Sequence, residues 1–150
     1  MVTVATPQRL LELTGRPLGV SGWRDVPQSD VDMFGRATGD EQWIHVDIER
    51  AANGPFGSTI AHGYMTLALV APLLWEVLAV ERASMAVNYG LNRVRFPAPL
   101  PVGARVRLAA TLESAERLDA GTQVVVGVEI ECDATRRPVC VAEVVLRFYD

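Results

Sequence analysis

Three stretches near the C-terminus alternate between apolar and polar residues with a period of two, and this pattern constrains the fold most strongly. They cover residues 104–114, 122–132 and 139–149. Such alternation is typical of strands that bury one face and expose the other. Turn residues at Asp119-Ala120-Gly121 and over 133–137 separate the stretches, so the sequence predicts an antiparallel meander of three strands.

The most apolar segment, from Gly63 to about Val80, is predicted to be the element that this sheet covers. Apolar side chains occur on nearly every side of a helix built from it, which is typical of a buried helix. Pro72 is expected to kink that helix. Further strands are expected over 17–25 and 83–96. The chain is therefore predicted to be α+β, with an antiparallel sheet of about five strands wrapped around one long buried helix.

Two shorter helices are expected before the buried one. The first covers residues 8–13, with Thr6 as its cap and Gly15 at its end. The second begins at Ser29 and ends at Gly39. A length of 150 residues predicts that all of these elements belong to a single domain spanning the whole chain.

Composition argues against several classes of protein. A formal net charge of -4 argues against a broad nucleic-acid surface. All 14 basic residues are arginine, and without lysine there is no Schiff-base, pyridoxal-phosphate or phosphate-loop lysine. No secretory signal or membrane span is recognisable, so a soluble, cytoplasmic protein is expected. Cys132 and Cys140 are expected to be free core thiols, because the ligands for a zinc site are too few.

The chemistry is expected in the stretch from Ala37 to His45, which places an acid and a base close together. Asp40 and His45 lie on a predicted loop, residues 40–47, that leads to a helical turn over 48–52. An irregular backbone can direct both side chains to one point, and such a pair suits proton transfer. The residues alone leave another interpretation open, in which Asp40 bonds its own backbone and His45 is a buried core residue.

Residues 34–51 resemble the signature of the MaoC-like dehydratases, also called type 2 or (R)-specific enoyl-CoA hydratases. The matching positions are Phe34, Thr38, Gly39-Asp40, Ile44, His45 and Ala51. The chain departs from the family pattern at Gln42, where asparagine is usual, and at Trp43, where proline is usual. Three more segments resemble the central helix and following strand of that family: Ile60-Ala61-His62-Gly63 with Thr66-Leu67, Asn88-Tyr89-Gly90 and Arg93-Val94-Arg95-Phe96-Pro97.

The resemblance implies a hot-dog fold, a homodimer and a hydro-lyase that adds water syn to a trans-2-enoyl-CoA to give (R)-3-hydroxyacyl-CoA. No cofactor is implied, because coenzyme A is part of the substrate. Asp40 and His45 would hold the water and return a proton to the α-carbon. The N–H of Gly63, at a helix N-terminus, would bind the thioester oxygen as it gains charge. The alternative for Gly63 is an ordinary glycine at a helix start.

Three further residues are candidates for contact with the substrate, and each has an alternative role. His62 neighbours Gly63, but it could instead only fix the loop. Arg93 and Arg95 could meet the phosphates of coenzyme A, or could form the wet face of a strand. No metal is expected. Two other functions stay open: a hot-dog acyl-CoA thioesterase and a non-catalytic acyl-binding subunit.

Overall fold

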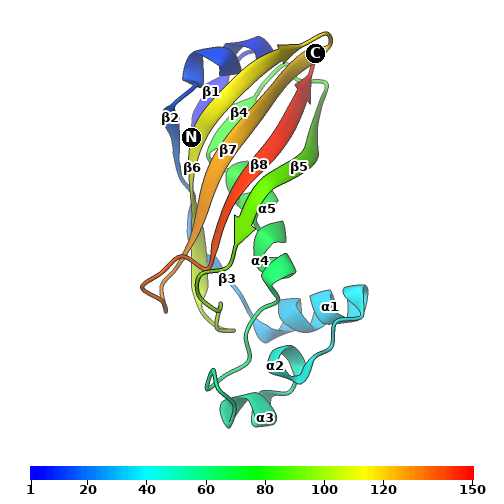
Figure 1. Ribbon diagram of the computed structural model, residues 1–150, viewed down its shortest axis with the longest axis vertical. Helices are drawn as coiled ribbons and strands as arrows, with labels where there is room; N and C mark the ends of the chain where they lie inside the picture. The colour runs from blue at the N-terminus through cyan, green and yellow to red at the C-terminus, as the bar shows by residue number, and fades with distance from the viewer.

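The computed structural model describes residues 1–150 as a long curved sheet lying over two short helices, with further helices at one end (Figure 1). Its strands are β1 (Val2–Val4), β2 (Arg16–Val20), β3 (Arg24–Asp25), β4 (Leu78–Val80), β5 (Met85–Arg95), β6 (Arg105–Leu118), β7 (Gly121–Cys132) and β8 (Cys140–Tyr149). Its helices are the 3₁₀ helix η1 (Pro7–Leu13), α1 (Gln28–Thr38), α2 (Trp43–Val46), α3 (Ile48–Ala52), α4 (Gly63–Ala68) and α5 (Val70–Leu74).

The predicted meander is confirmed. Strands β6, β7 and β8 follow one another antiparallel, within a sheet of order β2-β6-β7-β8-β5. β3 also pairs with β6, so the sheet has six strands where about five were expected. Asp119 and Ala120 form the tight turn between β6 and β7, since Leu118 pairs with Gly121. β1 and β4 make a separate parallel pair, and β5 is left at the edge of the main sheet.

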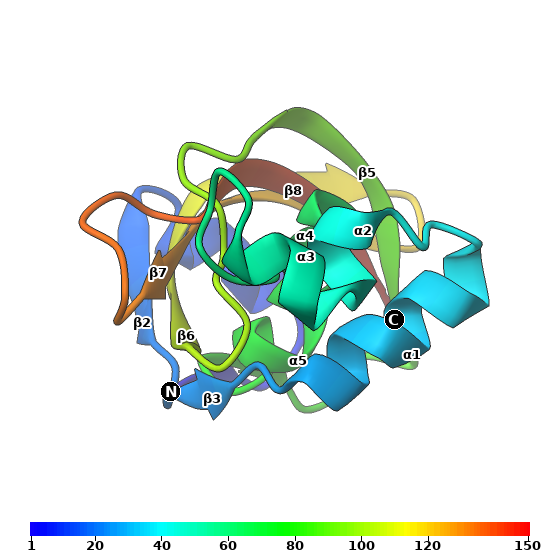
Figure 2. The ribbon, with the colours of Figure 1, turned by 90° about the horizontal axis from the view of Figure 1, so that it is seen from below.

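Alternate residues of the central strands build one face of the core, as the period of two predicts. Figure 2 shows the sheet curving around α4 and α5, whose apolar side chains supply the other face. Each fully buried valine or leucine contributes about 1.5–3 kcal/mol. The least exposed members of this core include Leu73, Leu74, Val106, Leu108, Leu112, Val124, Ile130, Leu146 and Phe148.

The central helix differs from the prediction of one long helix from Gly63 to about Val80. It is interrupted at Leu69, giving α4 and α5, and residues 78–80 form β4. Pro72 provides the reason for an interruption, because it has no N–H to donate to the carbonyl of Ala68 one turn earlier. None of the helices in the chain has the length and apolar character that crossing a membrane requires.

This helical region is also less buried than the prediction of an all-round buried helix required. Tyr64 is 76% exposed and Trp75 is 41% exposed, and the smaller Ala68 and Pro72 between them are exposed too. The sheet covers only the opposite side of the helices. An apolar strip of the protein surface therefore runs beside the edge strand β5.

The N-terminal helices form with different starts from those expected. Helix η1 is a 3₁₀ helix, and the Thr6 hydroxyl makes no capping bond. Helix α1 begins at Gln28, after Pro27, rather than at Ser29. Gly39 ends α1 as predicted, in a left-handed conformation with φ of 79° that glycine adopts without strain.

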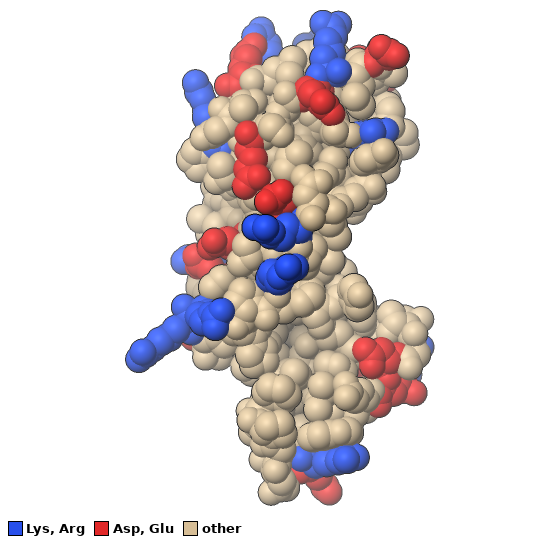
Figure 3. All heavy atoms as spheres, viewed as in Figure 1, with Lys and Arg blue, Asp and Glu red and all other residues tan.

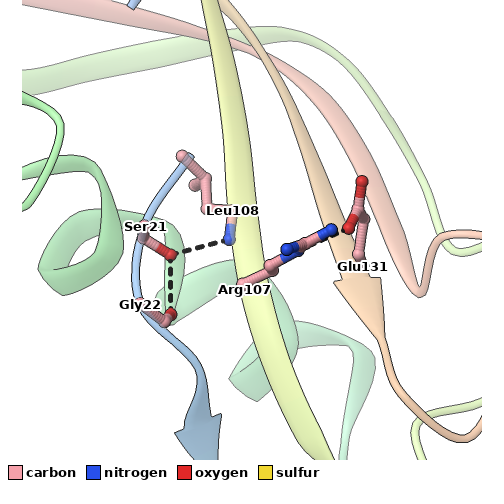
Figure 4. A network of polar contacts seen from close by, with 5 residues as sticks. All are labelled: Ser21, Gly22, Arg107, Leu108 and Glu131. Atoms are coloured by element: carbon pink, nitrogen blue, oxygen red, sulfur yellow. Dashed lines mark hydrogen bonds and ion pairs between the residues drawn. The ribbon is translucent and has the colours of Figure 1, made fainter. Parts of the chain in front are cut away.

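A small polar network ties the edge of the sheet opposite β5 to the central strands (Figure 4). The buried Ser21 hydroxyl accepts the N–H of Leu108 at 2.9 Å and donates to the carbonyl of Gly22 at 3.0 Å. Nearby, Arg107 and Glu131 form a cross-strand ion pair at 2.7 Å. The bond between Ser21 and Leu108 holds the chain against β6 where β2 has ended and β3 has not begun, and the ion pair joins β6 to β7.

Candidate active site

Asp40, one member of the candidate acid–base pair, follows directly from the end of α1. The Gly39 N–H closes the helix on the Gly35 carbonyl at 2.8 Å, and the Thr38 hydroxyl donates to the Phe34 carbonyl at 2.8 Å. Asp40 then lies on irregular backbone, as the sequence predicts, and its side chain is exposed. Its carboxylate is available to a ligand and to water.

His45, the other member of the pair, lies in a helical turn, which corrects the expectation of an irregular loop over residues 40–47. Helix α2 forms there. The His45 N–H donates to the carbonyl oxygen of Gln42 at 2.9 Å, and the Asp47 N–H donates to the carbonyl oxygen of Trp43 at 3.0 Å. Asp40 stays outside this turn, so the two side chains need not point to different helix faces. The departures from the family pattern at Gln42 and Trp43 are thus compatible with an ordered turn.

The ring of His45 is buried, 6% exposed, and its orientation is fixed. Nδ1 lies 2.6 Å from the carbonyl oxygen of Ile60, which can only accept a hydrogen bond. The neutral ring therefore carries its proton on Nδ1 and leaves Nε2 as a free acceptor. A free imidazole nitrogen of this kind is what a general base requires.

His45 and Gly63 line the same cavity, of about 350 Å³. Its other walls are mostly apolar, with Phe56, Ile60, Thr66, Phe96, Pro99 and Leu100 among the lining residues. A Cβ atom at Gly63 would lie 3.0 Å from the ring of Phe96, so glycine lets this ring pack closely against the start of α4. Gly63 is also the first residue of α4, where an N–H has no partner within the helix.

Asp40, His45 and His62 lie together, each offering one polar atom within 4.8 Å of the others. The rings of His45 and His62 are stacked, with centroids 3.8 Å apart and planes at 26°. Nearly parallel imidazoles direct their lone pairs side by side rather than toward one point, which does not suit shared coordination of a metal ion. The arrangement fits acid–base chemistry better.

Arg93 and Arg95 lie on the edge strand β5 and are exposed. They line a different cavity, of about 490 Å³, on the outer face of the sheet, together with Glu113, Glu129 and Glu143. Figure 3 shows positive and negative side chains interspersed on this face. The structure does not bring either arginine to the cavity of His45 and Gly63, and their contact with coenzyme A stays a prediction.

Sequence reasoning missed Gln28, which ties the site together at the start of α1. Its amide nitrogen donates to the His45 carbonyl at 2.7 Å and to Asp32 at 2.8 Å, and its amide oxygen accepts from the Thr59 hydroxyl at 2.6 Å. A glutamine at a helix start gives no signal of such a role. The segments on either side of His45 are nevertheless joined through this one side chain.

Sequence reasoning also missed Gly35, although here a signal existed. Glycine in the interior of a helix costs about 1 kcal/mol relative to alanine, so its presence in α1 indicates a close approach. A Cβ atom there would lie 3.0 Å from the carbonyl oxygen of Asp40 and 3.6 Å from the ring of His62. Gly35 makes room for the contact between these two residues.

Both cysteines are free and buried, as expected. Burial raises the pKa of the Cys140 thiol to about 11. Such a thiol is protonated at neutral pH and is a poor nucleophile. Cys140 is therefore not a candidate nucleophile.

Comparison with known proteins shows which family the chain resembles in sequence and in fold. The MaoC like domain family matches residues 9–133. The 3-hydroxyacyl-thioester dehydratase Z of Mycobacterium tuberculosis (strain ATCC 25618 / H37Rv) is 48% identical over 149 residues, covering 99% of each chain. Nodulation protein N of Rhizobium leguminosarum bv. viciae is 40% identical over 131 residues, covering 85% of this chain and 81% of that one. An (R)-hydratase of Pseudomonas aeruginosa has a TM-score of 0.73 at 21% identity, over 91% of this chain and 82% of that one.

A sheet curved around a central helical segment, with an acid and a base beside the start of that segment, defines a hot-dog protein of the hydratase and dehydratase type. The chain belongs to the MaoC-like dehydratase family. The hot-dog α+β fold and the hydro-lyase class expected from the sequence are thereby confirmed.

Proposed function

We propose that this chain catalyses the reversible syn hydration of a trans-2-enoyl-CoA to (R)-3-hydroxyacyl-CoA in fatty-acid metabolism. The observation that carries the proposal is the bond from His45 Nδ1 to Ile60, which leaves Nε2 free on a ring that shares a cavity with Gly63. The name of the Mycobacterium relative, a 3-hydroxyacyl-thioester dehydratase, supports this chemistry. The cytoplasmic location and the lack of any cofactor beyond the coenzyme A of the substrate belong to the same proposal.

The proposed reaction consumes one water and breaks the C2–C3 double bond. The water oxygen bonds to C3, the displaced electron pair forms an enolate on the thioester oxygen, and C2 then takes a proton. Asp40 and His45 hold the water, accept its proton and supply the one that C2 receives. The N–H of Gly63 binds the enolate oxygen, and such a donor typically contributes about 3 kcal/mol.

A thioesterase is the second candidate activity, because the apolar cavity would also accept an acyl thioester. It would direct the water at the carbonyl carbon instead of C3. A non-catalytic acyl-binding subunit would keep the cavity without using the acid and the base. The free His45 Nε2 near Asp40 favours the hydratase over the binding subunit.

One assay separates the three activities. The protein is incubated with a trans-2-enoyl-CoA while the conjugated thioester absorbance and the free thiol are followed separately. We expect loss of conjugation without thiol release. Thiol release would indicate a thioesterase, and no change in either signal would indicate the binding subunit.

The stereochemistry is tested by coupling hydration to an (S)-specific 3-hydroxyacyl-CoA dehydrogenase with NAD. One short segment carries both Asp40 and His45, so the hydroxyl and the proton should reach the double bond from the same side. We expect conjugation to disappear without NADH formation. Rapid NADH formation, with the selectivity of the dehydrogenase verified, would contradict the proposed (R) product.

The proposed assembly is a homodimer. The edge strand β5 is exposed along most of its length and carries Met85, Tyr89 and Leu91, beside the exposed strip with Tyr64 and Trp75. An unpaired apolar edge of this kind is normally covered by pairing. Light scattering should therefore give twice the monomer mass, and a monomer at working concentration would contradict the proposal.

A further inference from the structure

His62 is a buried polar side chain that the proposed reaction does not use. It is 2% exposed, and its Nδ1 has no hydrogen-bond partner within the protein. Leaving such a group unpaired costs about 1–3 kcal/mol. Neither His62 nor Asp40 is among the residues that line the cavity of His45 and Gly63, but both lie directly beside His45.

His62 is connected to each of the three residues to which we assign the chemistry. Its Nε2–H donates to the carbonyl oxygen of Asp40 at 2.8 Å, and its ring stacks on that of His45 at 3.8 Å. Its own peptide bond carries the N–H of Gly63. The carbonyl of His62 is held in turn by the N–H of Thr66 at 2.9 Å and the Thr66 hydroxyl at 3.1 Å.

The backbone at Asp40 has little else to hold it. Its N–H reaches the Thr38 hydroxyl only at 3.4 Å, which is long for a hydrogen bond. Gly35 leaves space for the Asp40 carbonyl and the His62 ring to meet, and Phe34 packs against that ring with centroids 5.0 Å apart. The bond from His62 is therefore the stronger of the two hydrogen bonds at the backbone of Asp40.

We propose that His62 is a positioning residue, whose Nε2–H bond to the Asp40 carbonyl holds the backbone of Asp40 in place beside His45 and Gly63. This inference rests on the proposed function for its effect on turnover. Its structural part is independent of that function. A displacement of a reacting group by about 1 Å can cost on the order of 100-fold in rate, so the expected effect is measurable.

Three variants separate the hydrogen bond from the ring. His62→Gln keeps an N–H donor near the position of Nε2, whereas His62→Asn carries the same amide one carbon short of it. His62→Phe keeps a flat ring but has no donor. With a trans-2-enoyl-CoA, we expect Gln to retain most of kcat, and Asn and Phe to lower kcat by about 10- to 100-fold with KM unchanged. Equal activity of all three folded variants would overturn the proposal.

A double-mutant cycle asks whether His62 acts through Asp40. In an Asp40→Asn background, His62→Phe should lower kcat little further, because the group that it positions has already lost its function. A full multiplicative loss would contradict the inference. Thermal melts of every variant show whether each one is folded.

Amide hydrogen exchange gives a readout that needs no activity. Exchange of the hydrogen-bonded amides of Gly39 and His45, on either side of the Asp40 carbonyl, should accelerate in His62→Phe and His62→Asn but not in His62→Gln, while β7 is unchanged. Unchanged exchange of both amides would overturn the positioning role. If the wild-type protein converts no enoyl-CoA, the proposed function fails, and the exchange result still decides the role of His62.

Discussion

The β6–β8 meander and the segment from Gln28 to His62 hold their shapes in different ways. In the meander, backbone pairs run along almost the whole of each strand, so no single side chain determines the geometry. In the segment, three short helices are joined through a few side chains, chiefly Gln28, His45 and His62. The sheet should therefore tolerate the replacement of single polar side chains, whereas the segment from Gln28 to His62 should not.

The largest effect is expected where the chemistry lies. Asp40→Asn and His45→Gln should each lower kcat by at least about 100-fold, the lower end for a positioned acid or base. Asp40→Asn should melt as the wild type does, because Asp40 is exposed, whereas His45→Gln loses the Nδ1–H bond to Ile60 and should have a somewhat lower Tm while it stays folded. Near-normal turnover of either folded variant would contradict the assignment of that residue.

A disruptive substitution in the sheet should have the opposite effect: it should lower stability and leave turnover unchanged. Gly121 has φ of 150°, and a Cβ atom there would collide with the backbone of Phe148. Gly121→Ala should cost about 2–4 kcal/mol of unfolding free energy and leave the kcat of the folded protein unchanged. Gly127→Ala is the matched control, because the added Cβ meets only the flexible side chain of Glu113.

Two glutamines compare the regions directly. Gln28→Ala leaves the His45 carbonyl and the Thr59 hydroxyl without their partner, and should cost about 1–2 kcal/mol and about 10-fold in kcat. Gln123 also makes two side-chain bonds, on the outer face of the sheet, to Glu116 and Arg147. Gln123→Ala should change stability by less than about 0.5 kcal/mol and kcat not at all. Equal effects of Gln28→Ala and Gln123→Ala on kcat would contradict the proposed difference between the two regions.

The smallest effect concerns a surface carboxylate of the sheet. Bonds from the backbone and the guanidinium of Arg105 lower the pKa of Asp133 below its ordinary value of 3.8. A lowered pKa in the folded state adds stability above pH 3.8, and that contribution is lost as the pH falls through the folded pKa. Asp133→Asn should slightly lower Tm at pH 7, and the difference should vanish in strong acid. A difference that grows in acid would contradict this sign.

The elements that a repeating pattern defines could be predicted from the sequence. The alternation over residues 104–149 gave three strands and their order, and Gly39 marked the end of α1. Helix α2 could not be predicted in this way, because its four residues are too few to show a period. Strands β1, β3 and β4 are shorter still, which is why the strand count came out low.

The candidate site divides in the same manner. Asp40 and His45 could be paired because they are close in sequence and match a family motif. The contact of His62 with both depends on how α4 packs against α1, and no local pattern reports it. Gln28 escaped for the same reason, since its partners at His45 and Thr59 lie far along the chain.

The pairing pattern of the sheet also has a consequence for the order of folding. The β6–β7 and β7–β8 hairpins pair residues that are near in sequence. The pairs Arg16–Leu112 and Met85–Tyr149, by contrast, join strands that are far apart in the chain. Loop closure disfavours distant pairs, so we expect the two hairpins to lie in the folding nucleus. The segment that carries Asp40 and His45 should then dock late, so that substitutions within it speed unfolding and leave the rate of folding almost unchanged.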